Sequence, residues 1–497
     1  MLHSKIILYL MGVLLCFNGG FMLLASGVSF FMEDQQTLAI LLAAFTALGL
    51  GGLLIVSMRN NNRQLAKRDG YIIVSCGWLL MSLSGTLPYL FSGAIPNFTD
   101  AFFESMSGFT TTGATILTEI EKVPKGILFW RSTTHWIGGM GIIVLALAIL
   151  PLLGIGGMQL FTAEAPGPSS DKLHPRITDT AKRLWLIYVL FTTLNALLLW
   201  SAGMSLFDAV NHAMSTLSTG GFSTKNSSLA HWNDFPWIQY ITVFFMILAG
   251  SNFVLSYFAF TGQFRKIFKD EEFKTYLGFL AVFTTIAFVY AWQSGIGADL
   301  SHFVDRQPWG ALESRFRHAL FQVVAVVTTT GFSTADFTLW GGFLTLFFFG
   351  LMFLGGSAGS TSGGIKVVRH LMMIKNGFLE FKRALHPNAI IQVRYNNRTV
   401  GTDITYTILA FFILYMISFI VGALGFGAMG LSFDSAAGLA ASTLGNVGPA
   451  LGDFGPSANY AALPVGGKFW ASFLMLIGRL ELFTVLIIFS PFFWRKF

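Results

Sequence analysis

TTTGA, residues 110–114, is the first of four related phrases that lie between long apolar segments of this chain. The other three are STGGF from residue 218, TTTGF from residue 328 and LGNVG from residue 444. Each phrase carries one aligned glycine, and the four glycines are roughly 110 residues apart along the chain. They are Gly113, Gly221, Gly331 and Gly448. Four small polar elements in an apolar setting predict a pore, because their backbone carbonyl groups can surround an ion on a common axis.

The composition identifies an integral membrane protein. Of the 497 residues, 54% are hydrophobic and only 11% are charged, whereas an average soluble domain has about 25% charged residues. Several apolar stretches exceed the ~20 residues that span a bilayer. The first of them, residues 6–31, is long for a signal peptide and lacks a small-residue cleavage site, so we expect it to be retained as a span.

The net charge of +7 reflects membrane topology rather than nucleic-acid binding. When the N-terminus is placed in the cytoplasm, most Lys and Arg residues fall on the inner side of the predicted spans, as the positive-inside rule requires. The two cysteines, Cys16 and Cys76, lie within predicted spans and indicate neither a disulfide framework nor a metal cluster.

The chain is predicted to be an all-α membrane protein with ten transmembrane helices and four re-entrant pore helices. Two spans, residues 6–31 and 36–58, come first. Four units follow in a fixed order of span, short amphipathic segment, glycine phrase and second span. Their paired spans are residues 71–92 and 127–153, 183–204 and 236–262, 275–294 and 339–371, and 401–424 and 466–493. The amphipathic segments are too short to cross a bilayer, so we expect re-entrant helices in four pseudo-symmetric repeats around one pore.

This order divides the chain into five parts. Residues 1–70 form an N-terminal two-helix hairpin with a basic loop. Residues 71–160 and 161–265 form the first two pore repeats. Residues 266–395 form the third repeat, which contains a glycine-rich loop, and residues 396–497 form the fourth.

Acidic residues stand near the start of three of the short segments, at Asp100, Asp208 and Asp434. An acid there caps a helix and complements its positive end, so that the negative end points toward the glycine phrase. The third segment departs from this pattern, with His318 at the aligned place and Glu313 upstream. The alternative is that these acids are ordinary N-caps without an electrostatic role, and the two interpretations are compatible.

The glycines suit a pore because a residue without a Cβ can adopt positive φ and turn its carbonyl group where other residues cannot. Non-helical backbone at membrane depth is tolerated only where protein buries it or where it lines a watery cavity. The alternative is that Gly and Thr merely allow close packing of spans. Four copies in register, each after a short helix, favour the pore.

With these phrases the chain resembles the Trk/Ktr/HKT superfamily of potassium transporters, and it is most similar to the TrkH-type subunits. The resemblance covers nearly the whole chain. It is carried by SMSGFTTTGAT from residue 105, STLSTGGFST from 215, VTTTGFSTAD from 327, STLGNVGPALGDFGP from 442 and IGRLELFT from 477. It implies potassium uptake across the bacterial inner membrane through a carbonyl-lined selectivity filter, with K⁺ as the transported ion.

The resemblance also implies which residues bind the ion. In plant relatives, serine at the first aligned glycine accompanies sodium transport, and here that position is Gly113. The phrases differ from one another and lack a full TVGYG, so less selective conduction of Na⁺ or Rb⁺, or ion-coupled symport, stays open. The expected metal-binding residues are Thr110, Thr111, Thr112, Gly113, Ser218, Thr219, Gly220, Gly221, Thr328, Thr329, Thr330, Gly331, Gly445, Asn446, Val447 and Gly448.

A run of ten small residues, GGSAGSTSGG, interrupts the third unit's second span at residues 355–364. Each Gly costs a helix about 1 kcal/mol relative to Ala, so the run predicts a loop inside the membrane. In an exposed position it would be a plain flexible linker. In TrkH-type relatives such a loop is a gate, and the implied gate residues are Gly355, Gly356, Gly359, Gly363, Gly364 and Lys366.

Arg479 is predicted to lie in the middle of the last span, where a charge is costly and normally faces a cavity or a partner. The resemblance implies an electrostatic barrier to cations in the gate. The alternative is a structural ion pair with Glu481 or a contact with the glycine-rich loop. Residues two apart face different sides of a helix, which makes Glu481 a poor partner within the helix.

The resemblance further implies a homodimer and a cytoplasmic TrkA-type regulator that binds NAD(H), ATP or ADP. The chain itself shows no nucleotide site, since GFGAMG from residue 425 ends an apolar span and has no βαβ context. Membrane lipid is an expected partner and nucleic acid is not. A secondary transporter would predict inverted repeats, and an enzyme would predict convergent His, Asp or Glu; the sequence offers neither pattern.

Overall fold

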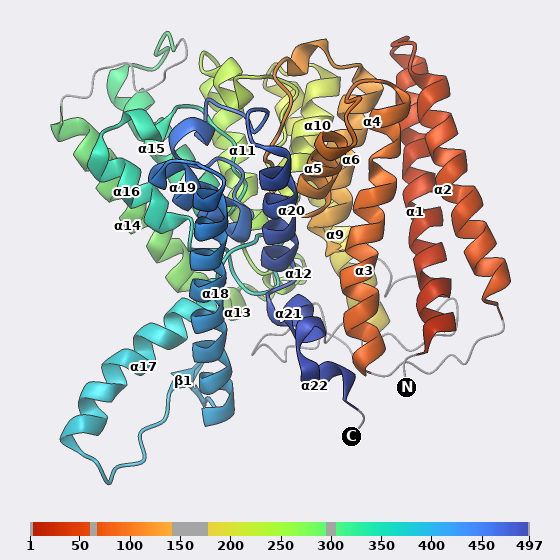
Figure 1. Ribbon diagram of the computed structural model, residues 1–497. Coiled ribbons are helices and arrows are strands. Elements are labelled where there is room, and N and C mark those ends of the chain that lie inside the picture. The colour runs from red at the N-terminus through yellow and green to blue at the C-terminus, as the bar shows by residue number, and fades with distance from the viewer. Residues whose placement is uncertain (1–2, 60–66, 142–176, 295–304, 496–497) are drawn as a thin grey trace.

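The computed structural model describes residues 3–59, 67–141, 177–294 and 305–495. In these ranges the fold is helical, apart from one antiparallel pair of two-residue strands, β1 (Arg394–Tyr395) and β2 (Arg398–Thr399). The hairpin of α1 (Ser4–Phe31) and α2 (Thr37–Ser57) lies at one edge of the molecule (Figure 1). Its helices approach closely at Gly51, where a β-carbon would lie 2.7 Å from the Gly12 carbonyl oxygen.

Four helical units follow the hairpin. The first contains α3 (Lys67–Gly85), α4 (Leu87–Phe91), α5 (Phe98–Phe109), η1 (Ile120–Lys122) and α6 (Lys125–Gly139). The second contains α9 (Ile177–Ser201), α10 (Leu206–Leu217), η2 (Ser228–Trp232), α11 (Pro236–Ala249), α12 (Phe253–Phe260) and α13 (Phe264–Lys269). The third contains α14 (Glu271–Gln293), α15 (Ala311–Val327), η3 (Phe337–Leu339), α16 (Gly342–Leu351) and α17 (Val367–Leu385), followed by the two strands. The fourth contains α18 (Thr402–Ala428), α19 (Phe433–Gly445), η4 (Gly452–Phe454), α20 (Val465–Arg479), α21 (Phe483–Phe489) and α22 (Pro491–Trp494).

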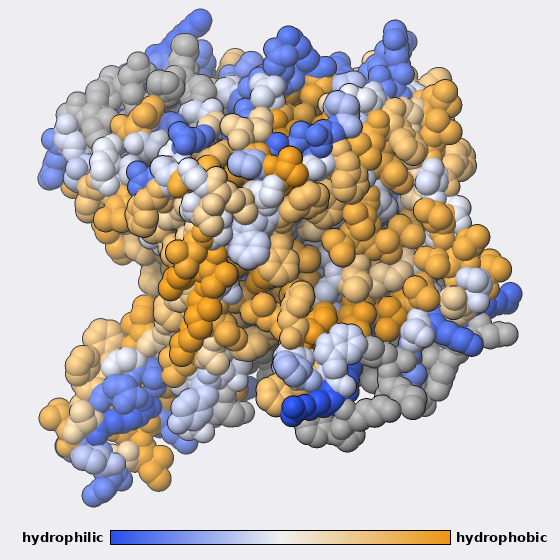
Figure 2. Space-filling view, viewed as in Figure 1, coloured by the Kyte–Doolittle hydropathy of each residue, from blue (hydrophilic) through white to orange (hydrophobic). Residues whose placement is uncertain are grey.

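The long helices suit a bilayer. Within the described ranges, six helices are long and apolar enough to cross a membrane, or up to eight if each of two bent pairs is counted as one span. Figure 2 shows a broad hydrophobic band around the middle of the molecule with hydrophilic residues above and below it. The chain is therefore a multi-pass helical membrane protein, and the finer count of ten spans stays a prediction.

The four short helices occur where the sequence predicts them. α5 and α10 each have 12 residues, α19 has 13 and α15 has 17. They lie inside the molecule: every residue of α5 from Ala101 to Phe109 is buried. Apolar side chains on the outer helices separate them from lipid. Re-entrant segments need this cover, because backbone with unpaired polar groups is not tolerated against lipid.

Two predictions about the second spans need correction. The predicted span 236–262 is two helices, α11 and α12, bent by 104°, and the span 466–493 is α20 and α21, bent by 117°. Arg479 is thus the last residue of α20 rather than the middle of a helix. The helix stops there because Glu481 and Leu482 adopt positive φ, which a right-handed helix cannot contain.

The second span of the third unit is interrupted, and that of the first unit is described only in its first part. In the third unit α16 ends at Leu351, and a loop separates it from α17, as the glycine-rich run predicts. In the first unit α6 ends at Gly139, and residues 142–153 of the predicted span lie outside the described residues. Much of the basic loop after α2, residues 60–66, also lies outside them.

The acids of the short helices are not N-caps. The capping side chains are Asn97, Ser205 and Ser432, which accept hydrogen bonds from backbone N–H groups in the first turns of α5, α10 and α19. Asp100 and Asp208 lie within those first turns. A carboxylate in a first turn still complements the positive end of the helix.

Candidate functional site

Each short helix ends in the same turn, which starts a glycine phrase. In the first unit the Thr112 N–H donates to the Ser107 carbonyl (2.9 Å) and the Thr111 N–H donates to the Gly108 carbonyl (3.0 Å). These are the two bonds of a Schellman motif. The same pair of bonds recurs in the other three units.

The left-handed position of this motif is not glycine here. It is occupied by Thr111, Thr219, Thr329 and Asn446, with φ of 52°, 53°, 55° and 54°. A β-branched residue with positive φ is uncommon and costs about 1–3 kcal/mol, so it persists only where the surroundings fix it. Three of the four residues are threonines of this kind, and the fourth is an asparagine, which adopts the conformation more readily. The recurrence of the turn in all four phrases indicates four copies of one built backbone turn.

The four aligned glycines close a ring, which we call the glycine ring. A β-carbon on Gly113 would overlap the carbonyl oxygen of Gly220, next to Gly221. One on Gly221 would overlap the carbonyl oxygen of Thr330, and one on Gly331 that of Val447. One on Gly448 would meet that of Thr112, which returns to the first repeat. The four glycines thus alternate with the carbonyl groups of their preceding residues around one axis.

Only glycine fits these four positions. Gly113, Gly221, Gly331 and Gly448 have φ of 81°, 80°, 72° and 100°, and each faces a backbone carbonyl that cannot move aside as a side chain can. Among the sixteen predicted metal-binding residues, Gly113, Gly221 and Gly331 are partly exposed and the others are buried. The backbone of the ring is therefore partly accessible at three of its glycines, and the side chains of the phrases are buried in the protein behind it.

Hydroxyl groups of the phrases bond to one another, away from the ring. Thr110 and Thr112 share a hydrogen bond of 2.8 Å between their Oγ1 atoms, and so do Thr328 and Thr330. Asn446 donates from Nδ2 to Thr112 Oγ1 at 2.9 Å and joins the fourth phrase to the first. Main-chain oxygens together with the negative ends of four helices form an environment that favours a cation.

A buried ion pair supports the first phrase from behind. Glu104 of α5 accepts from Arg131 Nε of α6 at 2.6 Å, and both side chains are almost completely buried. The same carboxylate accepts from the Ile116 N–H and the Thr115 hydroxyl, just beyond Gly113. Arg131 also donates to the Ser223 carbonyl of the second unit at 2.9 Å.

The second and third phrases are supported by histidines. His212 Nε2 lies 2.9 Å from the Ser223 hydroxyl, and His318 Nδ1 lies 2.9 Å from the Thr334 hydroxyl. Both hydroxyls follow the ring glycine by two or three residues. His212 therefore belongs to the support of the ring, as does His318 in place of an acid.

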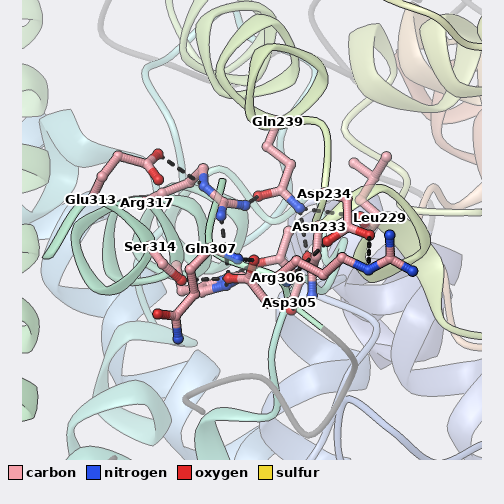
Figure 3. Close-up of polar contacts among 12 residues, drawn as sticks. Leu229, Asn233, Asp234, Gln239, Asp305, Arg306, Gln307, Glu313, Ser314 and Arg317 are labelled. Carbon is pink, nitrogen blue, oxygen red and sulfur yellow. Dashed lines mark hydrogen bonds and ion pairs between the residues drawn. The ribbon is translucent and has the colours of Figure 1, made fainter. Parts of the chain in front are cut away.

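The third support extends into a polar cluster at the N-terminal end of α15 (Figure 3). Arg317 contacts Glu313, Asp305 and Gln239, and Ser314 donates to Asp305. Burial alone raises the pKa of Asp305, but hydrogen bonds from His318 and Ser314 and the charge of Arg317 lower that pKa below the ordinary value for aspartate. The Arg317 guanidinium, which pairs with these carboxylates, donates to Gln239 Oε1 and so ties the third unit to α11 of the second.

The glycine-rich loop, residues 355–364, lies against the inner end of the phrases. The Gly363 N–H donates to Thr329 Oγ1 at 2.7 Å, and a β-carbon on Gly363 would lie 2.6 Å from the Gly445 carbonyl oxygen. The Thr361 hydroxyl donates to the carbonyl of Leu217, the last residue of α10, at 3.0 Å. The loop thus contacts the second, third and fourth units where their short helices end.

The loop is itself ordered by backbone bonds. The Gly355 N–H donates to the Ile365 carbonyl (2.8 Å), and the Val367 N–H donates to the Gly356 carbonyl (3.0 Å). Gly359 and Gly364 have positive φ, and Lys366 Nζ donates to the Ser362 carbonyl at 2.7 Å. All six loop residues of the predicted gate therefore belong to one compact turn.

Arg479 joins this loop to the first unit. Its guanidinium donates to the Thr361 carbonyl at 2.6 Å and to the Gly138 carbonyl, at the end of α6, at 2.5 Å. The Glu481 carboxylate forms an ion pair with Arg369 of α17. Of the two structural alternatives for Arg479, the loop contact is confirmed.

The sequence reasoning missed Glu104, Arg131 and the Arg317 cluster. The signal for the first two was a charged residue inside an apolar helical segment, which is costly unless it is paired. Among the residues that the structure describes, no group of three or more His, Cys, Asp or Glu is placed to hold a metal ion.

Comparison with known proteins gives one family. Residues 36–496 match the model of the TrkH family, described as a cation transport protein. The chain is 40% identical to the Trk system potassium uptake protein TrkH of Salmonella typhimurium over 499 residues, all of both chains. It is likewise 40% identical to the protein of that name from Halomonas elongata over 495 residues, 99% of each chain. The crystal structure of the potassium transporter TrkH from Vibrio parahaemolyticus superposes with a TM-score of 0.87 at 36% identity and covers 99% of this chain and all of that one.

Proposed function

The chain belongs to the TrkH family of cation transport proteins, which are transporters rather than enzymes, and from this premise we propose that it takes up potassium across the bacterial inner membrane. The observation that carries the proposal is the closed ring of four glycines and four carbonyl groups. A cation that loses its hydration shell needs oxygen ligands in place of the water, and the main-chain carbonyl groups of the glycine ring supply them.

In this proposal the four phrases are the selectivity filter. The carbonyl oxygens of Thr112, Gly220, Thr330 and Val447 form one coordinating level, and the rest of the sixteen phrase residues hold these oxygens in place. The positive φ at two positions of each phrase supports this, because it fixes the peptide planes before an ion arrives.

The loop of residues 355–364, Lys366 and Arg479 form the proposed gate. The loop and Arg479 together contact the inner ends of all four units, which is where a plug has to lie. The guanidinium adds positive charge beneath the filter and opposes the passage of a cation. Opening then requires the loop to leave the Thr329 hydroxyl and Arg479 to leave Thr361.

The proposed topology has ten spans and a cytoplasmic N-terminus. In Figure 1, α1 begins and α22 ends on the same side, the side toward which α17 projects. Lys375, Lys382 and Arg383 lie on α17. That side is the cytoplasmic one if the positive-inside rule holds.

The proposed partners follow from the family. A cytoplasmic TrkA-type regulator, carrying NAD(H), ATP or ADP, would bind the basic cytoplasmic side and act on the gate, and the transporter would work as a homodimer in lipid. The sequence predicts no nucleotide site on this chain itself. Size-exclusion chromatography with light scattering, with and without such a regulator, tests both associations.

Ion flux into liposomes tests the function. The wild-type chain should carry K⁺ and ⁸⁶Rb⁺ in preference to Na⁺. Gly113→Ser places a side chain against the Gly220 carbonyl and should lower the K⁺ over Na⁺ preference at least about tenfold, since even one misplaced ligand is worth more than 1.4 kcal/mol in a site of this kind.

Gly93→Ser is the matched control, because Gly93 also has positive φ (69°) but has nothing within 4 Å of its added β-carbon. Equal selectivity in the two variants would remove the filter assignment. Strict potassium flux, less selective monovalent cation flux and flux that needs a proton or sodium gradient are separated by the same assay with the gradients varied.

A further inference from the structure

The fourth ring glycine differs from the others in what its carbonyl contacts. The Gly448 carbonyl oxygen accepts a hydrogen bond from the Ser442 hydroxyl at 2.8 Å and from the Tyr460 hydroxyl at 2.5 Å. A carbonyl oxygen has two lone pairs, and here two donors occupy them. Little capacity is left on this oxygen for an ion.

The pseudo-symmetry of the chain provides the comparison. Ser107 and Ser215 occupy the places in the first and second repeats that Ser442 has in the fourth, six residues before the ring glycine. Their hydroxyls are buried and have no hydrogen-bond partner. Among the described residues, no hydrogen bond to the carbonyls of Gly113, Gly221 or Gly331 occurs.

The same serine therefore reaches the glycine carbonyl in one repeat and misses it in two others. The difference is Tyr460, whose hydroxyl also donates to the Gly448 carbonyl. The Gly448 carbonyl is thus bonded to the surrounding protein, whereas the carbonyls of Gly113 and Gly221 are not bonded to the equivalent serines.

Tyr460 is held firmly in this position. Its N–H donates to the Thr115 carbonyl at 2.8 Å, just beyond the first ring glycine. Its ring packs between Phe103 and Phe454, with both centroids 5.5 Å away, and the side chain is buried. Tyr460 thus joins the outer segments of the first and fourth repeats.

We propose that Tyr460 is a specificity-determining residue. Together with Ser442 it holds the Gly448 carbonyl away from the conduction axis. The outer level of the ring, formed by the carbonyls of the ring glycines themselves, is then left with three carbonyl ligands. The proposal rests on the proposed function of the ring. An ion at this level keeps water on its fourth side. Water adapts to Na⁺ and K⁺ alike, so the native site is less selective than a level with four carbonyls.

The hydroxyl is removed in Tyr460→Phe, and the K⁺ over Na⁺ flux ratio is measured in liposomes. The hydrogen bond that competes with the ion is worth about 1 kcal/mol net, so the ratio should rise about fivefold. The double variant Ser442→Ala with Tyr460→Phe should raise it further. Tyr276→Phe is the control, because that buried hydroxyl donates to the Ile247 carbonyl in α11.

Ser442→Ala provides an independent arm in case the tyrosine variant does not fold. Its control is Ser107→Ala, which removes the equivalent hydroxyl where it has no partner. A rise in the ratio for Ser442→Ala alone supports the proposal. A ratio that is unchanged or lower in the Tyr460 and Ser442 variants, with wild-type flux still selective for K⁺, overturns it. Absence of selective flux in the wild type would instead overturn the proposed function.

Discussion

Thr329 connects the glycine ring to the loop beneath it. Its backbone occupies the left-handed position of the turn, and its hydroxyl accepts the Gly363 N–H. Thr111 occupies the same backbone position in the first repeat, but its hydroxyl is buried without a partner. Substitution of the two threonines can therefore distinguish the effect of the backbone turn from the effect of the contact with the loop.

Thr329→Val removes that hydroxyl and keeps the branched shape. We expect basal ⁸⁶Rb⁺ flux to rise about fivefold, because a hydrogen bond worth about 1 kcal/mol no longer holds the closed loop. Thr111→Val should leave basal flux at the wild-type level. An equal effect of both variants, or of neither, would separate the loop from gating.

Glu104 and Arg131 represent a different kind of residue, one whose charge is tolerated only because it is paired. Glu104→Gln leaves the Arg131 charge buried without its counter-ion, and a broken buried pair costs about 3–5 kcal/mol. The thermal-unfolding midpoint in detergent should fall accordingly. Glu119→Gln, which breaks the exposed pair with Lys122, should shift the midpoint little. If the two variants lose the same stability, the buried pair is not a support of the ring.

At the scale of the element, the second helices of the repeats matter most for where they stop. The terminal carbonyls of α6 accept hydrogen bonds from Arg479, and the carbonyl of Ala249, the last residue of α11, accepts one from the Thr361 hydroxyl of the loop. The Gly250 carbonyl after α11 accepts the Ser357 N–H at 2.8 Å. The ends of broken helices thus provide backbone groups that hold the loop in place.

Arg479→Ala removes two donors that bridge the loop and α6. Hydrogen bonds from a charged group are worth about 1.5–3 kcal/mol, so basal flux should rise at least about tenfold. Deletion of residues 355–364 should raise it as well. Arg383→Ala, on the exposed part of α17, is the control and should have no effect. Unchanged flux in the Arg479 variant would show that this arginine does not hold the gate.

The elements also show how far the sequence predicts structure. The short helices and the loop were predictable, because a glycine phrase after a 12-residue amphipathic segment and a run of ten small residues are local signals. The bends after Ala249 and Arg479 were not, since apolar composition continues through both. The bend at Arg479 depends on two consecutive positive-φ residues, and neither Glu481 nor Leu482 signals that conformation.

At the scale of the whole molecule, four covalently linked units reproduce a symmetric ring with an unsymmetric sequence. The meeting of the four glycines was predictable from their spacing and is confirmed by the geometry. The side chains that support the glycines from behind were not predictable. Glu104, His212 and His318 each hold the segment after a ring glycine, but they are different residue types, so a search for repeated patterns does not find them. Tyr460 was invisible for a related reason: its partners lie in another repeat and more than ten residues back in its own.

The central claim is that the ring binds the transported ion with main-chain oxygens. An anomalous difference map of the protein crystallised in RbCl tests it most directly. We predict a Rb⁺ peak on the axis of the ring, at bonding distance from the carbonyl oxygens of Thr112, Gly220, Thr330 and Val447, and its loss when Na⁺ replaces Rb⁺. A map with ordered protein at the ring, no peak on that axis and Rb⁺ bound elsewhere in the membrane region would contradict the claim.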